Sequence, residues 1–348
     1  MMTALSGAPS ASPRPAQESK KAAGQCDRHR EGKTDMRKLI AFMMVLAMVC
    51  GLCAFAGAEG ELTVTAPNGA PALAIAAYVA ENKDIYTPVA ADIIGSTFVK
   101  GEADFIIAPV NAGALMHKKY VAGDNEHEYK LAAMVSWGNL YFAAQREELK
   151  PEDLNGAAIT LFGENTINAS VVLYALKELG IEPAKVEYLA GADKTKELLL
   201  SDADAIVVTA EPALTAAKFA AKQKEQVVSS VSVNELLKQA TGEDGYAQAA
   251  LFVKAETAAA QPEAVEAFLK SVEEACGKCA TDVEAVAEAA VALEILPNAK
   301  VAAAAIPGCA IRFVSAKEAR EQIEKTAGID LKQFGGELPP DDFYYGAE

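Results

Sequence analysis

The stretch "LTVTAPNGAPALAIAAYVAEN", Leu62 to Asn82, passes from a β-prone run into an apolar, alanine-rich segment of helical character. The turn between them, "PNGAP", carries almost no large side chains. Gly69 lets another molecule approach the backbone closely, and Pro71 suits the first turn of a helix. Because the first N–H groups of a helix have no partner within it, such a turn can bind a carbonyl, carboxylate or other anionic group. An ordinary strand-to-helix connection is the alternative.

Short apolar runs alternate with helical segments along the rest of the chain. Strands are expected at 62–66, 104–110, 130–137, 139–145, 157–163, 185–190, 204–210 and 246–255. Helices are expected at 71–81, 91–100, 112–120, 168–179, 194–200, 212–222, 233–241, 262–279, 282–293 and 316–327. Strands that alternate with helices of this length indicate α/β layers with mostly parallel sheets.

Two polar segments divide this pattern. The runs "REELKPEDLNGA" (146–157) and "ATGEDGYAQAAL" (240–251) are typical of passages between lobes. The simplest architecture has two α/β lobes joined by two crossover segments, with lobe 1 at 59–143 plus 246–348 and lobe 2 at 144–245. Ligands of open α/β sheets bind beyond the carboxyl ends of the strands, so the cleft between the lobes is the expected site.

The first 58 residues have the features of an export signal. Positive charge at 36–38 precedes an uncharged run at 39–58, which ends in the small-x-small pattern Ala56-Gly57-Ala58. We therefore expect a signal peptide at 36–58, cleaved near Ala58, and a periplasmic mature chain. The uncharged run is just long enough to span a bilayer, but its composition and cleavage pattern favour removal. Residues 1–35 are either a disordered extension or the product of a start codon placed too early.

Two cysteines in the apolar run raise the question of a lipid anchor. Cys50 follows Val49 and Cys53 follows Leu52, whereas a lipidated cysteine normally follows a small residue. A lipoprotein is therefore not expected.

Size and charge limit the function of the mature chain. Its 290 residues suffice for two modest domains. Without the eight basic and four acidic residues of the first 58, it has 24 basic and 44 acidic residues, a net charge of −20. Binding to nucleic acid or anionic headgroups depends on Lys and Arg contacts to phosphates, so neither partner is expected.

The motifs of common enzyme and metal sites are missing. The sequence has no GxGxxG, GxxxxGK[ST], GxSxG or HExxH motif, and the mature chain has only two histidines, His117 and His127, in a polar stretch. The run "CGKC", Cys276 to Cys279, has the CxxC spacing of redox and metal sites, but its context is helix-forming. A disulfide or buried thiols are more consistent with it than a metal site. No catalytic residue, metal or cofactor is predicted.

Polar residues do follow several strand ends, where ligands of α/β proteins bind. The segments "APVNAG", "VSWGNLYF", "LFGENTINAS" and "VVTAEPAL" each place such residues next to a strand. The candidate ligand-binding residues from these segments are Asn111, Ser136, Trp137, Asn139, Asn165, Thr166 and Glu211. They predict a site for a small polar solute.

Four segments also resemble a known family: "APNGAPALAIA", "GEADFIIAPVNAGALMHKK", "VVTAEPALTAAKFA" and the ending "IDLKQFGGELPPDDFYY". In this order, over nearly the whole mature chain, they are similar to solute-binding proteins of ABC importers, of the nitrate/sulfonate/taurine-type branch. The resemblance implies the type II periplasmic-binding-protein fold. It implies ligand contact for Asn68, Gly69, Ala70 and Pro71, and a place at the cleft or hinge for Asn111 and Glu211.

The function implied is that of a monomeric, non-enzymatic receptor that delivers a small polar solute to an ABC permease by closing its cleft. A sulfonate, nitrate or thiamine precursor is the kind of solute implied. Trp137 would stack on the solute or pack in the core near the hinge. Two alternatives stay open: a ligand-sensing module for a membrane receptor, and an enzyme on the same scaffold. The related pyrimidine synthases carry a dense cysteine/histidine iron site, which this sequence lacks.

Overall fold

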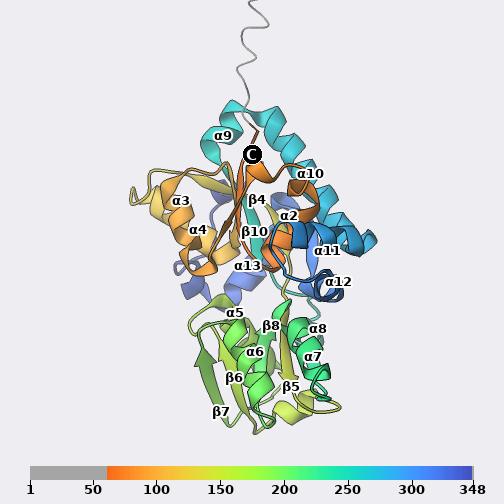
Figure 1. Cartoon of the computed structure of the whole chain (residues 1–348). Helices are drawn as coiled ribbons and strands as arrows, with labels where there is room; N and C mark the ends of the chain where they lie inside the picture. The colour runs from red at the N-terminus through yellow and green to blue at the C-terminus, as the bar shows by residue number, and fades with distance from the viewer. Residues whose placement is uncertain (1–60, 347–348) are drawn as a thin grey trace, which may run out of the picture. The chain divides into compact units, whose positions relative to one another are not determined.

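Two β-sheets organise the computed structural model, which describes residues 61–346 (Figure 1). The first sheet has the strand order β11-β4-β10-β3-β1-β2. Its strands are β1 (Val64–Pro67), β2 (Tyr86–Val89), β3 (Phe105–Pro109), β4 (Tyr129–Ser136), β10 (Ala249–Lys254) and β11 (Ile311–Ser315). The second sheet has the order β7-β6-β8-β5-β9. Its strands are β5 (Leu140–Ala144), β6 (Ala158–Phe162), β7 (Lys185–Leu189), β8 (Ile206–Ala210) and β9 (Ser229–Ser232).

Both sheets are mixed, whereas the alternation of strands and helices predicted mostly parallel sheets. In the second sheet, β5 pairs antiparallel with β8 and β9, while β6 pairs parallel with β7 and β8. In the first sheet, β10 pairs antiparallel with β3 and β4. The reason is geometric: β5 and β10 each begin where the chain arrives from the other sheet, at the carboxyl ends of their neighbours. They must therefore run antiparallel to those neighbours.

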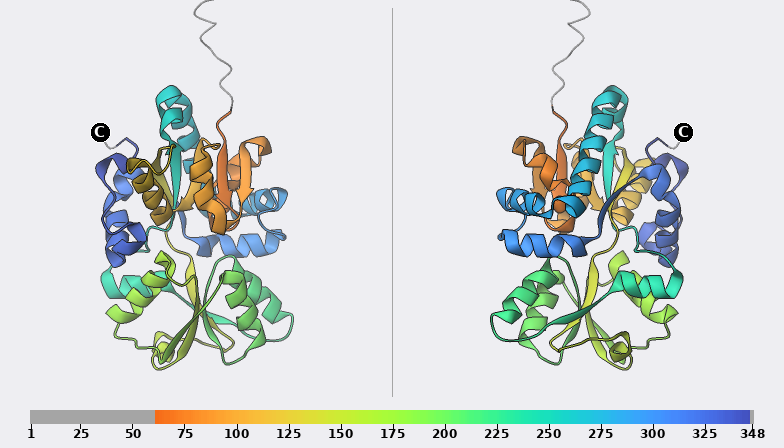
Figure 2. Two further views of the ribbon diagram at one scale, coloured as in Figure 1. Left: turned by 90° about the vertical axis from the view of Figure 1, so that its left-hand side faces the viewer. Right: turned by 90° about the vertical axis from the view of Figure 1, so that its right-hand side faces the viewer.

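Helices cover both faces of the first sheet. One face carries α2 (Ala70–Val79), α10 (Pro262–Thr281) and α11 (Val283–Ala292), and the other carries α3 (Ile94–Lys100), α4 (Val110–Val121) and α13 (Ala316–Ile329). The side views place α11 and the C-terminal α13 on opposite sides of this sheet (Figure 2). Because side chains alternate along a strand, Ile106 and Ile107 of β3 enter the two different cores.

The second sheet is covered in the same way. One face packs against α5 (Ile167–Glu178) and α8 (Val233–Thr241), the other against α6 (Ala192–Ser201) and α7 (Ala213–Lys222). The cluster on the α5 face continues into the first sheet's α13 side through Trp137, Leu140 and Tyr246. The two lobes therefore share one apolar core at the point where the chain passes between them.

The remaining described elements are short. They are α9 (Ala255–Ala260), α12 (Ala299–Ala305) and the 3₁₀ helices η1 (Lys83–Ile85), η2 (Ala91–Ile93), η3 (Pro151–Leu154), η4 (Ile306–Cys309), η5 (Leu331–Phe334) and η6 (Asp341–Phe343). The strands β2, β9 and β11 and the helices α9 and α12 were not expected from the sequence. For β2 and β9 the reason is local: "YTPV" and "SSVS" lie on sheet edges and lack a continuous apolar run.

The first passage between the sheets lies at residues 137–139, several residues before the expected boundary at 143. The whole of β5 pairs within the second sheet, in register with β8 from Leu140↔Ala210 to Ala144↔Ile206. The polar segment 146–157, which indicated the passage, instead connects β5 to β6 and contains η3.

Among residues 61–346, no helix combines the length and apolar character needed to cross a bilayer. The expected extension at 1–35 and the expected signal peptide at 36–58 lie outside the described residues.

Cys276, Cys279 and Cys309 are free, buried thiols. The first two lie on α10 and face α2, where their Sγ atoms donate to the carbonyl oxygens of Ala74 (3.4 Å) and Leu73 (3.7 Å). Burial raises the pKa of Cys279 to about 12 and raises that of Cys309 well above its ordinary value. The CxxC pair thus packs one helix against another in this structure.

Candidate ligand-binding site

Loops from the two sheets meet between the lobes. The loop after β1 contains Gly69, and the connection after β8 contains Pro212. A Cβ atom placed on Gly69 would lie 4.0 Å from Cδ of Pro212, within van der Waals range. Both segments follow strands at their carboxyl ends, where the cleft was expected. Candidate residues from the two lobes are therefore neighbours in the folded chain.

The loop after β1 presents backbone to this region. Gly69 has φ +108°, a value that a residue with a side chain rarely adopts, and it precedes α2. No side chain caps α2, and Pro71 lies in its first turn. Ala70 is buried, while Asn68 is exposed and accepts a hydrogen bond from the Tyr86 hydroxyl at 3.3 Å. The N-terminus of α2 thus has the uncapped character that the sequence suggested.

Asn111 lies in the first turn of α4, directly after β3. Its Oδ1 atom is buried and has no hydrogen-bond partner. No side chain caps α4, and the N–H of Val110 donates to the carbonyl oxygen of Gln248 at 2.9 Å. Because an unpaired buried polar atom costs free energy, a partner at Asn111 Oδ1 would stabilise the site.

Asn139, in the first crossover, and Glu211, at the end of β8, form a direct pair. The Asn139 Nδ2 group donates to the backbone oxygen of Glu211 at 2.7 Å, and the Glu211 N–H donates to the backbone oxygen of Asn139 at 3.0 Å. Asn139 Oδ1 accepts a hydrogen bond from Gln248 Nε2 at 2.9 Å. Ser136 joins the network, since its hydroxyl donates to Gln248 Oε1 at 3.3 Å. Three predicted residues are thereby brought together at the crossovers.

The Glu211 carboxyl group is buried, with a residue exposure of 7%. Burial raises its pKa above the ordinary value of 4.5, against the opposing effect of hydrogen bonds from Thr215. The Thr215 N–H donates to Oε2 at 3.0 Å and the Thr215 hydroxyl to Oε1 at 2.8 Å. Glu211 therefore caps the start of α7 while it faces the other lobe.

Three further predicted residues, Trp137, Thr166 and Asn165, also lie outside this network. Trp137 is buried in the shared core; its Nε1–H donates to the Arg312 carbonyl at 2.9 Å, and the Arg312 guanidinium lies 4.7 Å from its ring centre. Thr166 caps α5 by accepting from Ala169 N–H at 3.4 Å. Asn165 is exposed with φ +58° in the β6–α5 loop.

Sequence reasoning missed several polar residues that connect the lobes. Asn168 Oδ1, on α5, accepts hydrogen bonds from the Tyr246 hydroxyl at 2.9 Å and from Gln248 Nε2 at 3.4 Å. The Ser170 hydroxyl donates to Asp330 Oδ2 at 2.7 Å. The one available signal was Gln248, a polar residue inside the apolar run at 246–255. Its partners come from distant parts of the sequence.

A second contact between the lobes involves η4. The Tyr141 hydroxyl, from β5, donates to the Gly308 carbonyl oxygen at 3.0 Å. The preceding helix, α12, packs against α7 of the second lobe. This contact lies beside Glu211, and it joins the two lobes at the end of β8.

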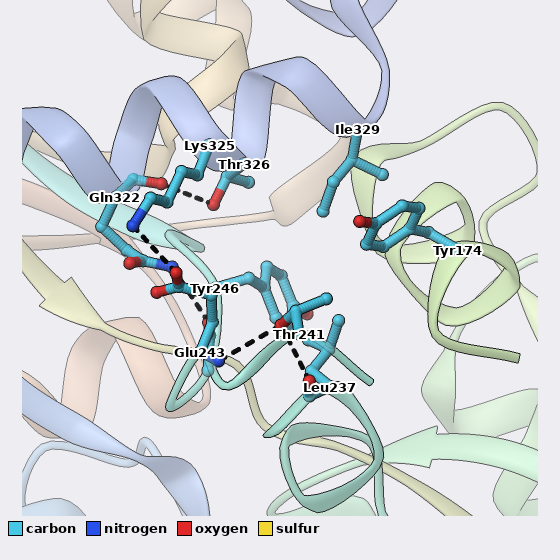
Figure 3. Close-up of a pocket in the computed structure, with 10 residues that line it drawn as sticks. Tyr174, Leu237, Thr241, Glu243, Tyr246, Gln322, Lys325, Thr326 and Ile329 are labelled. Atoms are coloured by element: carbon cyan, nitrogen blue, oxygen red, sulfur yellow. Dashed lines mark hydrogen bonds and ion pairs between the residues drawn. The ribbon is translucent and has the colours of Figure 1, made fainter. Parts of the chain in front are cut away.

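A pocket lies between α13 and the helices α5 and α8 (Figure 3). Its empty volume is about 570 Å³, and its rim carries an ion pair between Lys325 and Glu243 at 2.8 Å. The apolar part of its lining includes Leu237, Tyr246 and Ile329. None of the residues predicted from the sequence lines this pocket, so it is distinct from the meeting point of the strand-end loops.

Within residues 61–346, no group of three His, Cys, Asp or Glu side chains is arranged to hold a metal ion.

Comparison with known proteins provides independent evidence. Residues 131–285, from β4 to α11, match the family model described as NMT1/THI5 like. Among solved structures, an ABC transporter protein from Parabacteroides distasonis aligns with a TM-score of 0.68 and 21% identity, covering 83% of this chain and 100% of that chain. Together with the two binding proteins described next, this alignment shows that the chain has the periplasmic-binding-protein fold. This confirms the predicted fold class of two α/β lobes joined by two crossovers.

Two further structures with this fold have ligand classes in their names. The periplasmic aliphatic sulphonate binding protein SsuA from Escherichia coli aligns with a TM-score of 0.57 and 13% identity, covering 79% of this chain and 88% of that chain. The alkanesulfonate-binding protein SsuA from Xanthomonas axonopodis pv. citri, bound to MOPS, aligns with a TM-score of 0.54 and 14% identity, covering 84% and 99%. At the level of the fold, these neighbours confirm the resemblance to solute-binding proteins. The comparison with curated proteins gives no match.

Proposed function

We propose that the chain is an extracytoplasmic solute-binding protein that delivers a small polar solute to an ABC permease. The observation that carries the proposal is the meeting of strand-end loops from the two lobes, at Gly69 and Pro212. The periplasmic-binding-protein fold and the NMT1/THI5-like match support it. The solute would enter an open cleft and stabilise the closed arrangement by contacts to both lobes, because a ligand shifts an equilibrium only by its differential affinity.

The proposed contacts come from the residues predicted at the strand ends. In lobe 1 they are Asn68, Gly69, Ala70, Pro71 and Asn111; from the end of β4 onwards they are Ser136, Trp137, Asn139, Asn165, Thr166 and Glu211. The free Oδ1 atom of Asn111 and the uncapped start of α2 supply an acceptor and donors for a polar solute. A sulfonate, nitrate or thiamine-precursor-like solute is proposed, held by a monomeric protein without a catalytic step. The proposal includes cleavage of the signal peptide near Ala58 and a periplasmic location.

A thermal-shift screen tests the proposal. The purified protein is unfolded and refolded to remove bound solute, then heated with sulfonates, nitrate, bicarbonate, thiamine precursors, amino acids and aromatic acids. A solute at a hundred times its Kd should add about 2.7 kcal/mol to the free energy of unfolding. We expect one chemical class to raise the melting temperature in proportion to the logarithm of its concentration. A well-folded protein that responds to no member of the panel would contradict the proposed solute classes.

A further inference from the structure

The contact between η4 and the second lobe brings the side chains of Tyr141 and Glu211 close to Gly308. A Cβ atom there would lie 2.9 Å from the Tyr141 hydroxyl, 3.0 Å from Cγ of Glu211 and 3.3 Å from Glu211 Oε1. Cβ contacts shorter than about 3.4 Å are tighter than most that occur in proteins. All three atoms belong to the other lobe, so the restriction comes from the approach of the lobes.

The backbone of Gly308 does not itself require glycine. Gly308 is absent from the residues with positive φ, and it lies within the 3₁₀ helix η4. An alanine could therefore adopt this backbone conformation if the first lobe stood alone. In its backbone conformation Gly308 differs from Gly69 and Gly245, whose φ values of +108° and +98° would strain any residue with a side chain.

A hydrogen bond stabilises the contact between Tyr141 and Gly308. The Tyr141 hydroxyl, whose pKa is raised to about 12 by burial, stays protonated and donates to the Gly308 carbonyl at 3.0 Å. Two residues later, Ala310 accepts a hydrogen bond from the Trp137 N–H at 3.0 Å. The segment 308–310 is therefore hydrogen-bonded both to Trp137 of the first crossover and to Tyr141 of β5.

We propose that Tyr141 and Gly308 form an interlobe contact that sets how closely the two lobes approach and thereby biases their equilibrium between closed and open arrangements. The absence of a side chain at Gly308 permits the close approach, and the Tyr141 hydrogen bond stabilises it. Both act as positioning residues. The inference rests on the proposed function, in which a solute is held by closure of the lobes.

The test compares solute-free variants. Gly308→Ala should raise the radius of gyration measured by small-angle X-ray scattering, because the added methyl group separates the lobes. It should also shift the emission of Trp137, the single tryptophan of the chain, which lies at the first crossover. Gly277→Ala is the matched control: Gly277 lies on α10 with nothing within 4 Å of an added Cβ, so neither quantity should change.

Two further variants identify the cause. Tyr141→Phe removes the hydrogen bond without adding a clash and should move both quantities in the same direction by a smaller amount. The double variant Tyr141→Phe/Gly308→Ala lacks the Tyr141 hydroxyl oxygen, the atom nearest the added Cβ. Its radius of gyration and Trp137 emission should therefore lie between those of Gly308→Ala and those of Tyr141→Phe. Unchanged values in Gly308→Ala, or no such intermediate values in the double variant, would overturn the inference. If Gly308→Ala does not fold, unchanged values in Tyr141→Phe overturn it.

The solute is added only in a second arm, which keeps the two proposals apart. With a solute from the thermal-shift screen, Gly308→Ala should bind about tenfold more weakly than Gly277→Ala. If no solute binds the native protein, the proposed function fails while the solute-free measurements still decide the interlobe contact. If the solute binds all variants equally, Tyr141 and Gly308 do not bias closure and the inference fails.

Discussion

At the scale of single residues, Glu211 combines two tasks. Its carboxylate accepts two hydrogen bonds from Thr215 at the start of α7, and its side chain lies against Gly308 of the other lobe. The sequence placed Glu211 at a strand end beside Pro212 but gave no sign of either neighbour. Burial, which only the folded chain creates, is what raises its pKa.

The raised pKa predicts a pH-dependent contribution to stability. An acid whose pKa is higher in the folded protein favours folding in its protonated form, so its contribution is full below the ordinary value of 4.5 and is lost as pH rises towards the folded value. In Glu211→Gln the side chain stays neutral, so native stability minus variant stability should fall as pH rises through this window. Urea unfolding over a pH series measures the difference.

The exposed Glu164→Gln provides the control for this experiment, because it removes the same charge from a solvated position. The stability of Glu211→Gln should also differ from that of the native protein by an amount that does not change with pH. The reason is that both carboxyl oxygens accept from Thr215, whereas in glutamine one of them is replaced by an amide nitrogen, which cannot accept. A difference that is flat with pH, or that rises with it, would contradict the role assigned to burial.

At the scale of elements, α12 and η4 form the segment of the first lobe that contacts the second lobe. The helix α12 has only seven residues, "AKVAAAA", and its start depends on Asn298. Asn298 Oδ1 accepts hydrogen bonds from the N–H groups of Lys300 at 2.9 Å and Val301 at 3.2 Å. Such a short helix is marginal without a cap and without packing, so the cap and the contact with α7 both matter.

Removal of this cap should weaken the protein measurably. Asn298→Ala is expected to lower the free energy of unfolding by about 1 kcal/mol, because two N–H groups lose their acceptor. Asn298→Asp should keep most of the stability, since aspartate caps helices equally well. Urea unfolding of the three proteins measures the effect; an equal loss in the alanine and aspartate variants would show that capping is not the cause.

At the scale of the whole molecule, the proposed site lies where the two lobes meet. Asn111 comes from the first lobe, Asn139 from the first crossover and Glu211 from the second lobe, with Gln248, the residue before β10, bonded to Asn139. The shared core through Trp137 and Tyr246 holds the two sheets together at the crossovers. A solute that contacts both lobes would therefore act on their relative approach.

Asn111 provides the prediction at this scale. Asn111→Ala should weaken binding of the solute about tenfold, the equivalent of ~1.4 kcal/mol, through loss of a polar contact. Its thermal stability without solute should be unchanged or slightly higher, because the replaced Oδ1 atom is buried without a partner. Isothermal titration and thermal unfolding measure the two effects.

The control for Asn111 is Asn125→Ala. Asn125 also has a buried Oδ1 without a partner, but it lies in the loop beyond the other end of α4. Its substitution should leave solute affinity unchanged. Unchanged affinity in Asn111→Ala, or an equal loss in both variants, would remove Asn111 from the site.

Much of the fold could be predicted from the sequence alone, because helices and buried strands leave a local periodicity. The alternation of apolar runs and helical segments predicted the α/β class, most of the strands, and the turn at Gly69 whose backbone conformation favours glycine. Edge strands such as β2 and β9 were not predicted, because half-exposed strands do not need an apolar run. Strand-end polar residues were visible because a polar residue after an apolar strand is also a local signal.

Only the tertiary structure decided which of these residues meet. Hydrogen bonds such as Gln248 to Asn139 and Tyr141 to Gly308 join residues more than a hundred positions apart, and no local pattern encodes them. The position of the first crossover followed from the pairing of β5 with β8, which polarity alone misplaced. The tight space around Gly308 is created by side chains of the other lobe rather than by its own φ. Local periodicity determines the elements of this chain, and long-range packing determines its site.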